Sequence, residues 1–199
     1  MREKSMDTNQ IVDTNAYYKE HAEEYIKATE NIDMSREHEM FERHLGEGQQ
    51  FILDVGCGSG RDARYFKSQG HHVIAIDPNV EFVEHARNFQ IDAYQSDVAH
   101  IEFLDMFDGI WACAVLLHYR KKELAAAFSK LYNALKEGGI LYCSFKYGDK
   151  EEDRNGRHYS DLTDESIKEY IGDFEMIDVM ITDDRSNRNV RWLNVILKK

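Results

Sequence analysis

Cysteine and proline are scarce in this chain of 199 residues, which contains three cysteines and one proline. Cys57, Cys113 and Cys143 show no paired spacing, and an odd count fits neither a disulfide framework nor a zinc cluster. We therefore expect free thiols and no bound metal. The chain also lacks repeats, low-complexity stretches and proline-rich linkers, so we expect one domain over residues 1–199.

Long apolar runs and a positive net charge are missing too. No run approaches the roughly 20 apolar residues that cross a bilayer, and residues 1–10 are polar rather than signal-like. We therefore expect a cytoplasmic protein without a membrane partner. The formal net charge of -12 would repel a phosphate backbone, so no nucleic-acid partner is expected.

The order of helical and strand-like segments predicts an α/β fold. Residues 13–29 and 35–46 show the spacing of amphipathic helices and predict an N-terminal helical arm over residues 1–46. Over residues 50–199, short apolar runs alternate with helical segments, as in a parallel sheet with helices on both faces. Strands are predicted at 51–55, 73–76, 93–95, 109–116, 140–145, 175–182 and 190–197, and helices at 62–69, after Asn79, and at 121–136 and 163–171.

The last two predicted strands are separated only by the polar turn 183–189. This turn is too short for a crossover helix, so the two strands must be antiparallel neighbours. The expected core is a seven-stranded, mostly parallel sheet with one antiparallel strand near the C-terminus.

The first predicted strand ends in a glycine-rich turn, Leu53-Asp54-Val55-Gly56-Cys57-Gly58-Ser59-Gly60, which opens a helix. Glycines at such a turn let a ligand touch the backbone, and the helix N-terminus attracts an anionic group. Asp77 ends the second predicted strand, where a carboxylate can bind both hydroxyls of a ribose. Together these features predict a nucleoside-ligand site rather than an ordinary tight turn. The NAD fingerprint needs a glycine at the position of Arg61, so an NAD-dependent oxidoreductase is disfavoured.

At these positions the sequence resembles the class I S-adenosylmethionine-dependent methyltransferases, across about residues 50–146. The resemblance is carried by the glycine-rich turn, Asp77, Ser96-Asp97, Phe107-Asp108-Gly109-Ile110 and Leu135-Lys136-Glu137-Gly138-Gly139-Ile140-Leu141. Within that family the chain is similar to a small bacterial subgroup called tellurite-resistance-type, through stretches that include Gly60-Arg61-Asp62 and Trp111-Ala112-Cys113. The resemblance implies a Rossmann-like fold, S-adenosylmethionine as methyl donor, S-adenosylhomocysteine as product, and no metal.

The resemblance also implies roles for individual residues. The glycines of the turn would line the methionine and ribose part of the cofactor, Asp77 would bind the ribose, and Asp97 with the Val98 backbone would bind the adenine. Arg61 would pair with the cofactor carboxylate. The tyrosines of the arm would close over the cofactor or simply pack on the sheet. The implied cofactor-binding residues are Asp54, Gly56, Cys57, Gly58, Gly60, Arg61, Asp77, Pro78, Asp97, Val98, Ala112, Cys113, Tyr18 and Tyr25.

The acceptor side is less defined. His118 follows the fourth predicted strand, at the edge of the sheet where it is either a general base toward an acceptor or a structural residue. The loops after the fifth strand and between the last two strands hold residues that either bind an anionic acceptor or form a solvated basic rim. These candidate substrate-binding residues are Lys146, Tyr147, Arg154, Arg157 and Arg185.

The expected function is transfer of a methyl group to a small molecule by in-line displacement. The fourth predicted strand is not followed by the Asn/Asp-Pro-Pro-aromatic segment that acts on amino groups of DNA bases, which favours a small acceptor. A non-catalytic protein that binds S-adenosylmethionine as a sensor or partner module would share the same cofactor half and stays an alternative. The acceptor, its nucleophilic atom and the choice between monomer and homodimer are left open by the sequence.

Overall fold

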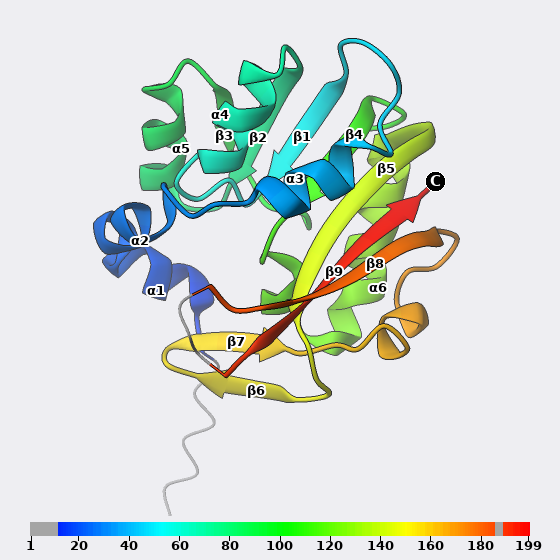
Figure 1. Ribbon diagram of the computed structural model, residues 1–199. Coiled ribbons are helices and arrows are strands. Elements are labelled where there is room, and N and C mark those ends of the chain that lie inside the picture. The colour runs from blue at the N-terminus through cyan, green and yellow to red at the C-terminus, as the bar shows by residue number, and fades with distance from the viewer. Residues whose placement is uncertain (1–11, 186–188) are drawn as a thin grey trace, which may run out of the picture.

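A seven-stranded sheet forms the centre of the computed structural model, which describes residues 12–185 and 189–199 (Figure 1). From one edge to the other, its strands are Asp92–Gln95 (β3), His72–Asp77 (β2), Phe51–Val55 (β1), Phe107–Ala112 (β4), Leu135–Lys146 (β5), Arg191–Lys198 (β9) and Glu175–Asp183 (β8). The first five of these pair in parallel, whereas β9 is antiparallel to both of its neighbours. The predicted fold class, with one antiparallel strand near the C-terminus, is confirmed.

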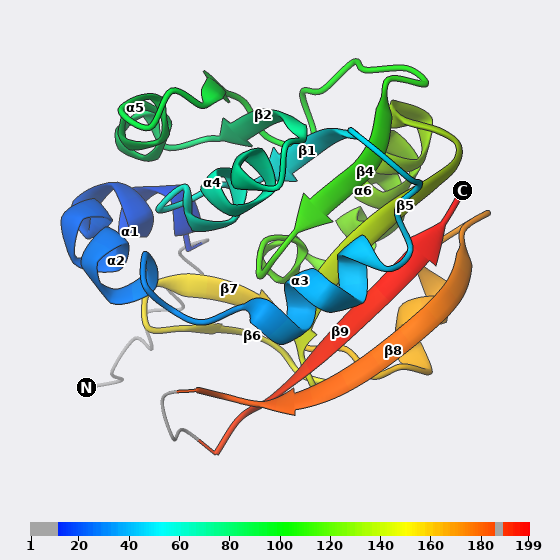
Figure 2. The same ribbon diagram turned by 45° about the horizontal axis from the view of Figure 1, so that its top comes forward.

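The sheet has a hydrophobic core on each face, because successive residues of a strand point to opposite sides. The helices that cover it are α3 (Ser35–Glu42), α4 (Arg61–Ser68), α5 (Val80–Arg87) and α6 (Lys121–Ala134). Leu53 and Ile110 face the core under α6, whereas Ile52 and Trp111 face the core under the other three helices. Figure 2 shows α3 in front of the sheet and α6 behind it.

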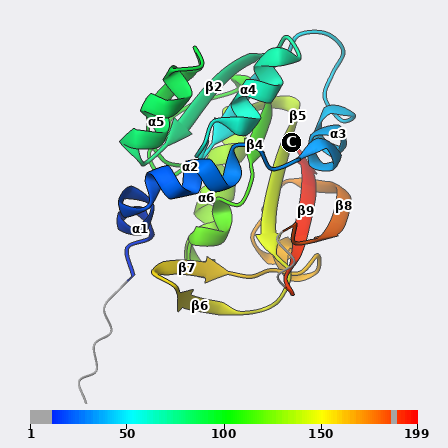
Figure 3. The same ribbon diagram turned by 60° about the vertical axis from the view of Figure 1, so that its left-hand side comes forward.

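Two short helices, α1 (Thr14–Glu20) and α2 (Ala22–Thr29), form the described part of the N-terminal arm. The single helix predicted over 13–29 is wrong, because the backbone leaves helical geometry at His21, with φ -116° and ψ 20°. Asp13 caps α1: its carboxylate accepts two backbone N–H groups of the first turn. Figure 3 shows the arm beside α5, at one end of the sheet.

A hairpin of β6 (Glu151–Arg154) and β7 (Arg157–Ser160) follows β5. We expected only a polar loop here, although the pair Asn155-Gly156 is a strong signal for a two-residue hairpin turn. Both residues have the positive φ angles that such a turn requires, 51° and 74°. The hairpin matters for function because β7 contacts α1 of the arm.

Two further predictions differ from the structure. The fourth strand ends at Ala112 rather than at residue 116, and Leu116–His118 form a short 3-10 helix, η1. The helix predicted at 163–171 is wrong, because only Ser166–Glu169 form a 3-10 turn, η2. Thr163 and Ser166 each accept the backbone N–H of the other, which competes with regular helix formation.

Some expectations fall outside the described part of the chain. Residues 1–11 of the predicted arm and residues 186–188 of the predicted turn are not among the described residues. Of the helices in the described ranges, none is long and apolar enough to span a membrane.

Candidate functional site

A cavity of about 370 Å³ lies at the carboxyl ends of β1, β2, β3 and β4, the edge at which open α/β sheets bind their ligands. Each strand contributes the loop that follows it, and the arm supplies the opposite wall (Figure 1). The cofactor-binding residues that the sequence predicted and that do line the cavity are Tyr18, Tyr25, Gly56, Gly58, Asp77, Pro78, Asp97, Val98 and Cys113. Asp54, Cys57, Gly60, Arg61 and Ala112 belong to the same loops and strand ends but do not line it.

The glycine-rich turn needs glycine for both conformation and space. Gly56, Gly58 and Gly60 have φ angles of 66°, 50° and 67°, in the left-handed region that other residues avoid. A β-carbon on Gly56 would lie 2.4 Å from the Val115 side chain, and one on Gly58 would lie 3.0 Å from the Tyr25 ring. The turn therefore brings bare backbone to the cavity wall.

Asp77 is buried at the end of β2 and holds the glycine-rich turn in place. Its Oδ2 accepts the N–H of Gly58 at 3.0 Å, and its Oδ1 accepts the N–H of Asn79 at 2.9 Å. Burial raises the pKa of Asp77 to about 6, and the two backbone hydrogen bonds oppose this rise. Each carboxylate oxygen keeps a further acceptor position, so the group can also receive hydroxyls from a ligand in the cavity.

Asp54 lies beneath the turn rather than in the cavity wall. It is buried, and its Oδ2 has no hydrogen-bond partner among the described residues. Burial, with Asp62 nearby, raises the pKa of Asp54 well above its usual range. Asp54 therefore lies outside the cavity wall, and its contact with a cofactor stays a prediction.

Asp62 in the first turn of α4 was not predicted, and it organises the region behind the cavity. Arg61 donates to both carboxylate oxygens, from Nε at 2.8 Å and from Nη2 at 2.7 Å. His38 of α3 and Trp111 of β4 each approach at 2.9 Å. Burial opposes ionisation, but the Arg61 charge and these hydrogen bonds hold the pKa of Asp62 below its usual range. Two stretches of the resemblance, Gly60-Arg61-Asp62 and Trp111-Ala112-Cys113, are therefore joined by one hydrogen bond.

Arg61 already has a counter-ion in Asp62. Its Nη2 also lies 3.9 Å from the sulfur of Cys113, which does line the cavity. Arg61 is thus beside the cavity wall, and its pairing with a cofactor carboxylate remains a proposal. Burial, helped by the negative charge of Asp62, raises the pKa of the Cys113 thiol to about 12. Cys113 therefore contributes an uncharged surface to the cavity.

The far end of the cavity is built around Asp97 and its neighbours. Asp97 accepts the backbone N–H of His100 at 3.1 Å, and its Oδ1 lies 2.6 Å from the ring Nδ1 of the same histidine. Sequence reasoning missed several residues that line the cavity and have no local motif: Asn79, Phe82, Ser96, Ala114, Val115, Tyr119 and His158. Phe82 and Val115 adjoin no predicted site residue, whereas the other five each follow or precede one in the sequence: Asn79, Ser96, Ala114, Tyr119 and His158.

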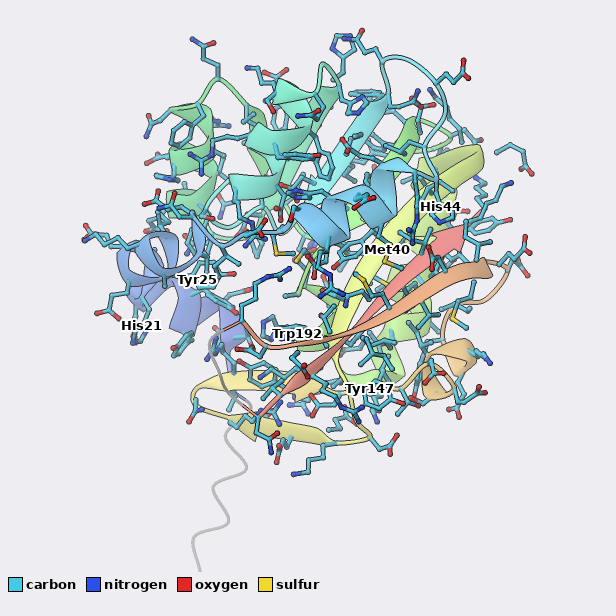
Figure 4. The ribbon with its side chains drawn as sticks, in the orientation of Figure 1. His21, Tyr25, Met40, His44, Tyr147 and Trp192 are labelled. Atoms are coloured by element: carbon cyan, nitrogen blue, oxygen red, sulfur yellow. The ribbon has the colours of Figure 1, made fainter. Side chains whose placement is uncertain are left out.

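The arm places an aromatic wall over the glycine-rich turn. The rings of Tyr18 and Tyr25 pack edge to face at 5.2 Å, and both contact Phe82 of α5, at 6.2 and 5.3 Å. Burial raises the pKa of both tyrosines, so their hydroxyls stay protonated. Figure 4 shows Tyr25 on α2, apart from Tyr147 at the other end of the structure.

His118 in η1 is held on both sides. Its Nδ1 lies 2.7 Å from the carbonyl oxygen of His158, and a carbonyl only accepts, so Nδ1 carries the proton. Its Nε2, 2.9 Å from the Tyr18 hydroxyl, is therefore the acceptor in that contact. Burial lowers the pKa of His118 to about 4, and the hydrogen bond to the His158 carbonyl opposes this fall only in part. The imidazole is neutral at neutral pH, with its lone pair engaged.

None of the five candidate substrate-binding residues lines the cavity. Arg154 pairs with Glu152 and Asp161, Arg185 with Glu37, and the Tyr147 hydroxyl with Asp164. Lys146 lies 3.8 Å above the Tyr159 ring. Arg157 lies over the rings of Tyr17, Tyr18 and Tyr159, and of these Tyr18 is a cavity residue. The pairing of Arg154 and Arg185 with acids supports the alternative of a charge-balanced rim.

The described residues contain no cluster of side chains suited to bind a metal ion. Within residues 12–185 and 189–199, no group of three or more His, Cys, Asp or Glu side chains is placed to hold a metal ion. The three cysteines are free thiols there.

Part of the sequence is similar to known methyltransferases. Residues 52–139 match the family model described as a methyltransferase domain. A malonyl-(acyl-carrier protein) O-methyltransferase from Salmonella typhimurium is 33% identical over 100 residues, which cover 47% of this chain and 39% of that protein. The chain thus spans well under half the length of this curated relative.

Solved structures share the fold over most of the chain. A Burkholderia thailandensis 1,6-didemethyltoxoflavin-N1-methyltransferase, crystallised with 1,6-didemethyltoxoflavin and S-adenosylhomocysteine, has a TM-score of 0.76 at 21% identity and covers 92% of this chain and 84% of its own. The cyclase SpnF has a TM-score of 0.74 at 16% identity, with coverage of 93% and 94%. Residues 52–139 are therefore similar to a methyltransferase domain, and the chain shares the Rossmann-like fold of these solved structures.

Proposed function

We propose that the protein binds S-adenosylmethionine and transfers its methyl group to a small-molecule acceptor. The observation that carries the proposal is the meeting of Gly56, Gly58, Asp77 and Asp97 in one cavity at the carboxyl edge of the sheet. The match of residues 52–139 to the methyltransferase-domain family supports it.

The residues present fit this cofactor. The glycine-rich turn presents backbone to the cavity, and β-carbons at Gly56 and Gly58 would displace Val115 and Tyr25, which also line it. Asp77 keeps acceptor positions for two ribose hydroxyls, and Asp97 lies where an adenine amino group would be met. When bound, the cofactor supplies an activated methyl group on a positively charged sulfur, so the protein needs mainly to align the reactants and exclude water.

The volume of the cavity supports a small acceptor. About 370 Å³ lies near the lower end of the range for small-molecule sites, and a nucleoside cofactor fills much of it. Tyr18 and Tyr25 of the arm pack against each other and line the cavity beside the glycine-rich turn. Kinship with the tellurite-resistance-type subgroup is part of the proposal and rests on the sequence resemblance alone. Fold-level kinship does not transmit a substrate.

Thermal unfolding with S-adenosylhomocysteine, S-adenosylmethionine and NAD in parallel tests the cofactor. A ligand at a hundred times its dissociation constant adds about 2.7 kcal/mol to the free energy of unfolding. We expect both adenosyl compounds to stabilise the protein, and Asp77→Asn to weaken their binding about 10- to 100-fold through the lost charged hydrogen bonds. The matched control is Asp105→Asn, at an exposed carboxylate paired with Lys199. Stabilisation by NAD alone would contradict the assignment.

Methyl transfer itself needs a separate measurement. The protein is incubated with methyl-labelled S-adenosylmethionine and a protein-free cell extract, and both S-adenosylhomocysteine and labelled metabolites are followed. We expect labelled metabolites to form together with S-adenosylhomocysteine. Tight adenosyl binding without transfer would instead favour the sensor or partner module.

A further inference from the structure

The acceptor end of the cavity is formed by three segments that are far apart in the sequence. Tyr18 comes from α1, His118 from η1 and His158 from β7, and all three line the cavity. Arg157 of β7 does not line the cavity but contacts Tyr18. The Tyr18 hydroxyl lies 2.9 Å from His118 Nε2 and accepts a hydrogen bond from Arg157 Nη1 at 3.5 Å. Figure 3 shows α1 and β7 on the same side of the molecule.

Among the described residues, both histidines at this end have each ring nitrogen within hydrogen-bond distance of another group. His118 is neutral and already accepts the Tyr18 hydroxyl. His158 Nδ1 lies 2.6 Å from Asp153, and its Nε2 lies 3.2 Å from the Ser160 hydroxyl. The acids nearby have partners too: Asp13 caps α1, and Glu123 accepts the backbone N–H of Arg120. These partners favour an acceptor that is already ionised over one that must first lose a proton at the site.

Arg157 provides a cation that lacks a counter-ion. Its guanidinium lies 4.4 Å from the Tyr17 ring centre, 5.6 Å from that of Tyr18 and 5.5 Å from that of Tyr159. Its Nε is buried and has no hydrogen-bond partner, and no carboxylate of the described residues lies within ion-pair distance. A half-buried cation without a carboxylate is costly unless a ligand pairs with it. In a chain with a net charge of -12, such a group favours an anionic ligand.

We propose that the acceptor is a small carboxylic acid, whose carboxylate binds Arg157 beside the cavity and is methylated on oxygen to give a methyl ester. This inference rests on the proposed methyl transfer. A planar guanidinium matches a carboxylate in two parallel hydrogen bonds. A thiol or a phenol, with ordinary pKa values of about 8.5 and 10, is mostly protonated at neutral pH and would first have to lose its proton.

The reaction balances without a proton acceptor. A carboxylate oxygen uses one lone pair to bond the methyl carbon while the carbon–sulfur bond breaks, and that bonding pair stays on sulfur. One negative and one positive charge disappear together, leaving a neutral ester and a neutral thioether. In this scheme His118 is a positioning residue, because it orients the Tyr18 hydroxyl through Nε2.

The chemical stability of the product tests the inference. Labelled metabolites from the extract reaction are treated with dilute alkali, which releases the methyl group of an ester as volatile methanol and leaves ether, N-, S- and C-methyl groups intact. We expect the label to become volatile. Label that survives alkali would refute the carboxylic acid while leaving methyl transfer standing, and absence of any transfer would refute the proposed function and this inference together.

Variants at Arg157 test how the acid is bound. The acid released by alkali is purified and used as substrate. Arg157→Gln should raise its KM about 10- to 100-fold, as expected for loss of a charged hydrogen-bonded pair, and Arg157→Lys should restore part of the loss. The matched control is Arg191→Gln, which removes a guanidinium 4.7 Å above the Tyr147 ring, outside the cavity. Unchanged KM in Arg157→Gln, with S-adenosylhomocysteine affinity retained, would overturn the assignment.

A variant at His118 separates positioning from base catalysis. His118→Asn keeps a neutral side chain that can accept the Tyr18 hydroxyl. We expect kcat to fall less than about tenfold and to stay level between pH 6 and 9, because loss of a general base costs about 100- to 10,000-fold. A loss of that size, or a rate that rises with pH through one ionisation, would contradict methylation without a base.

Discussion

Replacing Asp62 by asparagine should destabilise this protein more than any exposed carboxylate replacement. In the structure Asp62 receives four hydrogen bonds, two from Arg61 and one each from His38 and Trp111. Its side chain is 9% exposed, and that of Arg61 is 17% exposed, so water can do little to replace the lost charge. Asp62→Asn leaves the Arg61 cation buried without a counter-ion.

Two routes give the size of the effect. Breaking a buried ion pair on one side costs about 3–5 kcal/mol. Counting donors gives a similar value: the asparagine amide nitrogen cannot accept, so about two of the four donors lose their acceptor at about 1–3 kcal/mol each. We therefore expect a loss of about 3–5 kcal/mol in the free energy of unfolding, which lowers Tm by roughly 6–20 °C in a chain of this size.

Urea or thermal denaturation at pH 7 measures the loss. Asp178→Asn is the matched control, because that carboxylate is 23% exposed and pairs with Arg43 and His44 nearer the surface, where a pair contributes about 1 kcal/mol or less. The double variant Asp62→Asn, Arg61→Met should recover part of the loss, since the unpaired cation is then gone. A loss below about 1 kcal/mol in Asp62→Asn would refute the reasoning, as would an equal loss in the control.

Three further outcomes follow from the site. Burial raises the pKa of Asp77 to about 6, above its unfolded value near 3.9, so the free energy of unfolding of the ligand-free protein should fall by about 2–3 kcal/mol as pH rises from about 4 to 6. Denaturation of Asp77→Asn at several pH values should lack this slope, and an equal slope would exclude Asp77 as its source. Gly58→Ala places a β-carbon 3.0 Å from Tyr25 at a φ of 50°, so we expect the free energy of unfolding to fall by about 1–2 kcal/mol. Calorimetry should also show weaker S-adenosylhomocysteine binding, and full affinity would contradict the close approach of Gly58 to Tyr25. Gly156→Ala at the hairpin turn places a β-carbon 2.8 Å from Tyr17 at a φ of 74°, which should lower the free energy of unfolding by about 1–2 kcal/mol. It should also raise the acceptor KM and leave S-adenosylhomocysteine affinity unchanged; a change confined to cofactor affinity would show that the hairpin serves the other end of the cavity.

The strand order and the cofactor side of the cavity were accessible from the sequence because their signals are local. Five residues, 51–55, form β1 as predicted, and the positive φ angles of Gly56 and Gly58 explain why only glycine suits that turn. Asp77 is placed by the strand that precedes it. The hairpin turn carries an equally local signal in its Asn155-Gly156 pair, which our sequence prediction of a polar loop did not include.

Only the tertiary structure decided which charges are neutralised. The sequence grouped Arg154, Arg157 and Arg185 as equivalent basic residues, yet two of them pair with acids and one lies on tyrosine rings. The Asp62 carboxylate likewise gathers partners from α3 and β4 that no spacing rule connects.

One physical cause explains why the sequence predicts some of these features and not others. Backbone conformation and strand periodicity depend on neighbours within a few residues, so the sequence itself determines the elements, the glycine-rich turn and the carboxylate at the end of β2. Hydrogen bonds and ion pairs between side chains far apart in the chain depend on how those elements pack. The meeting of Tyr18, His118 and Arg157, and with it the chemistry of the acceptor end, is therefore set by packing alone.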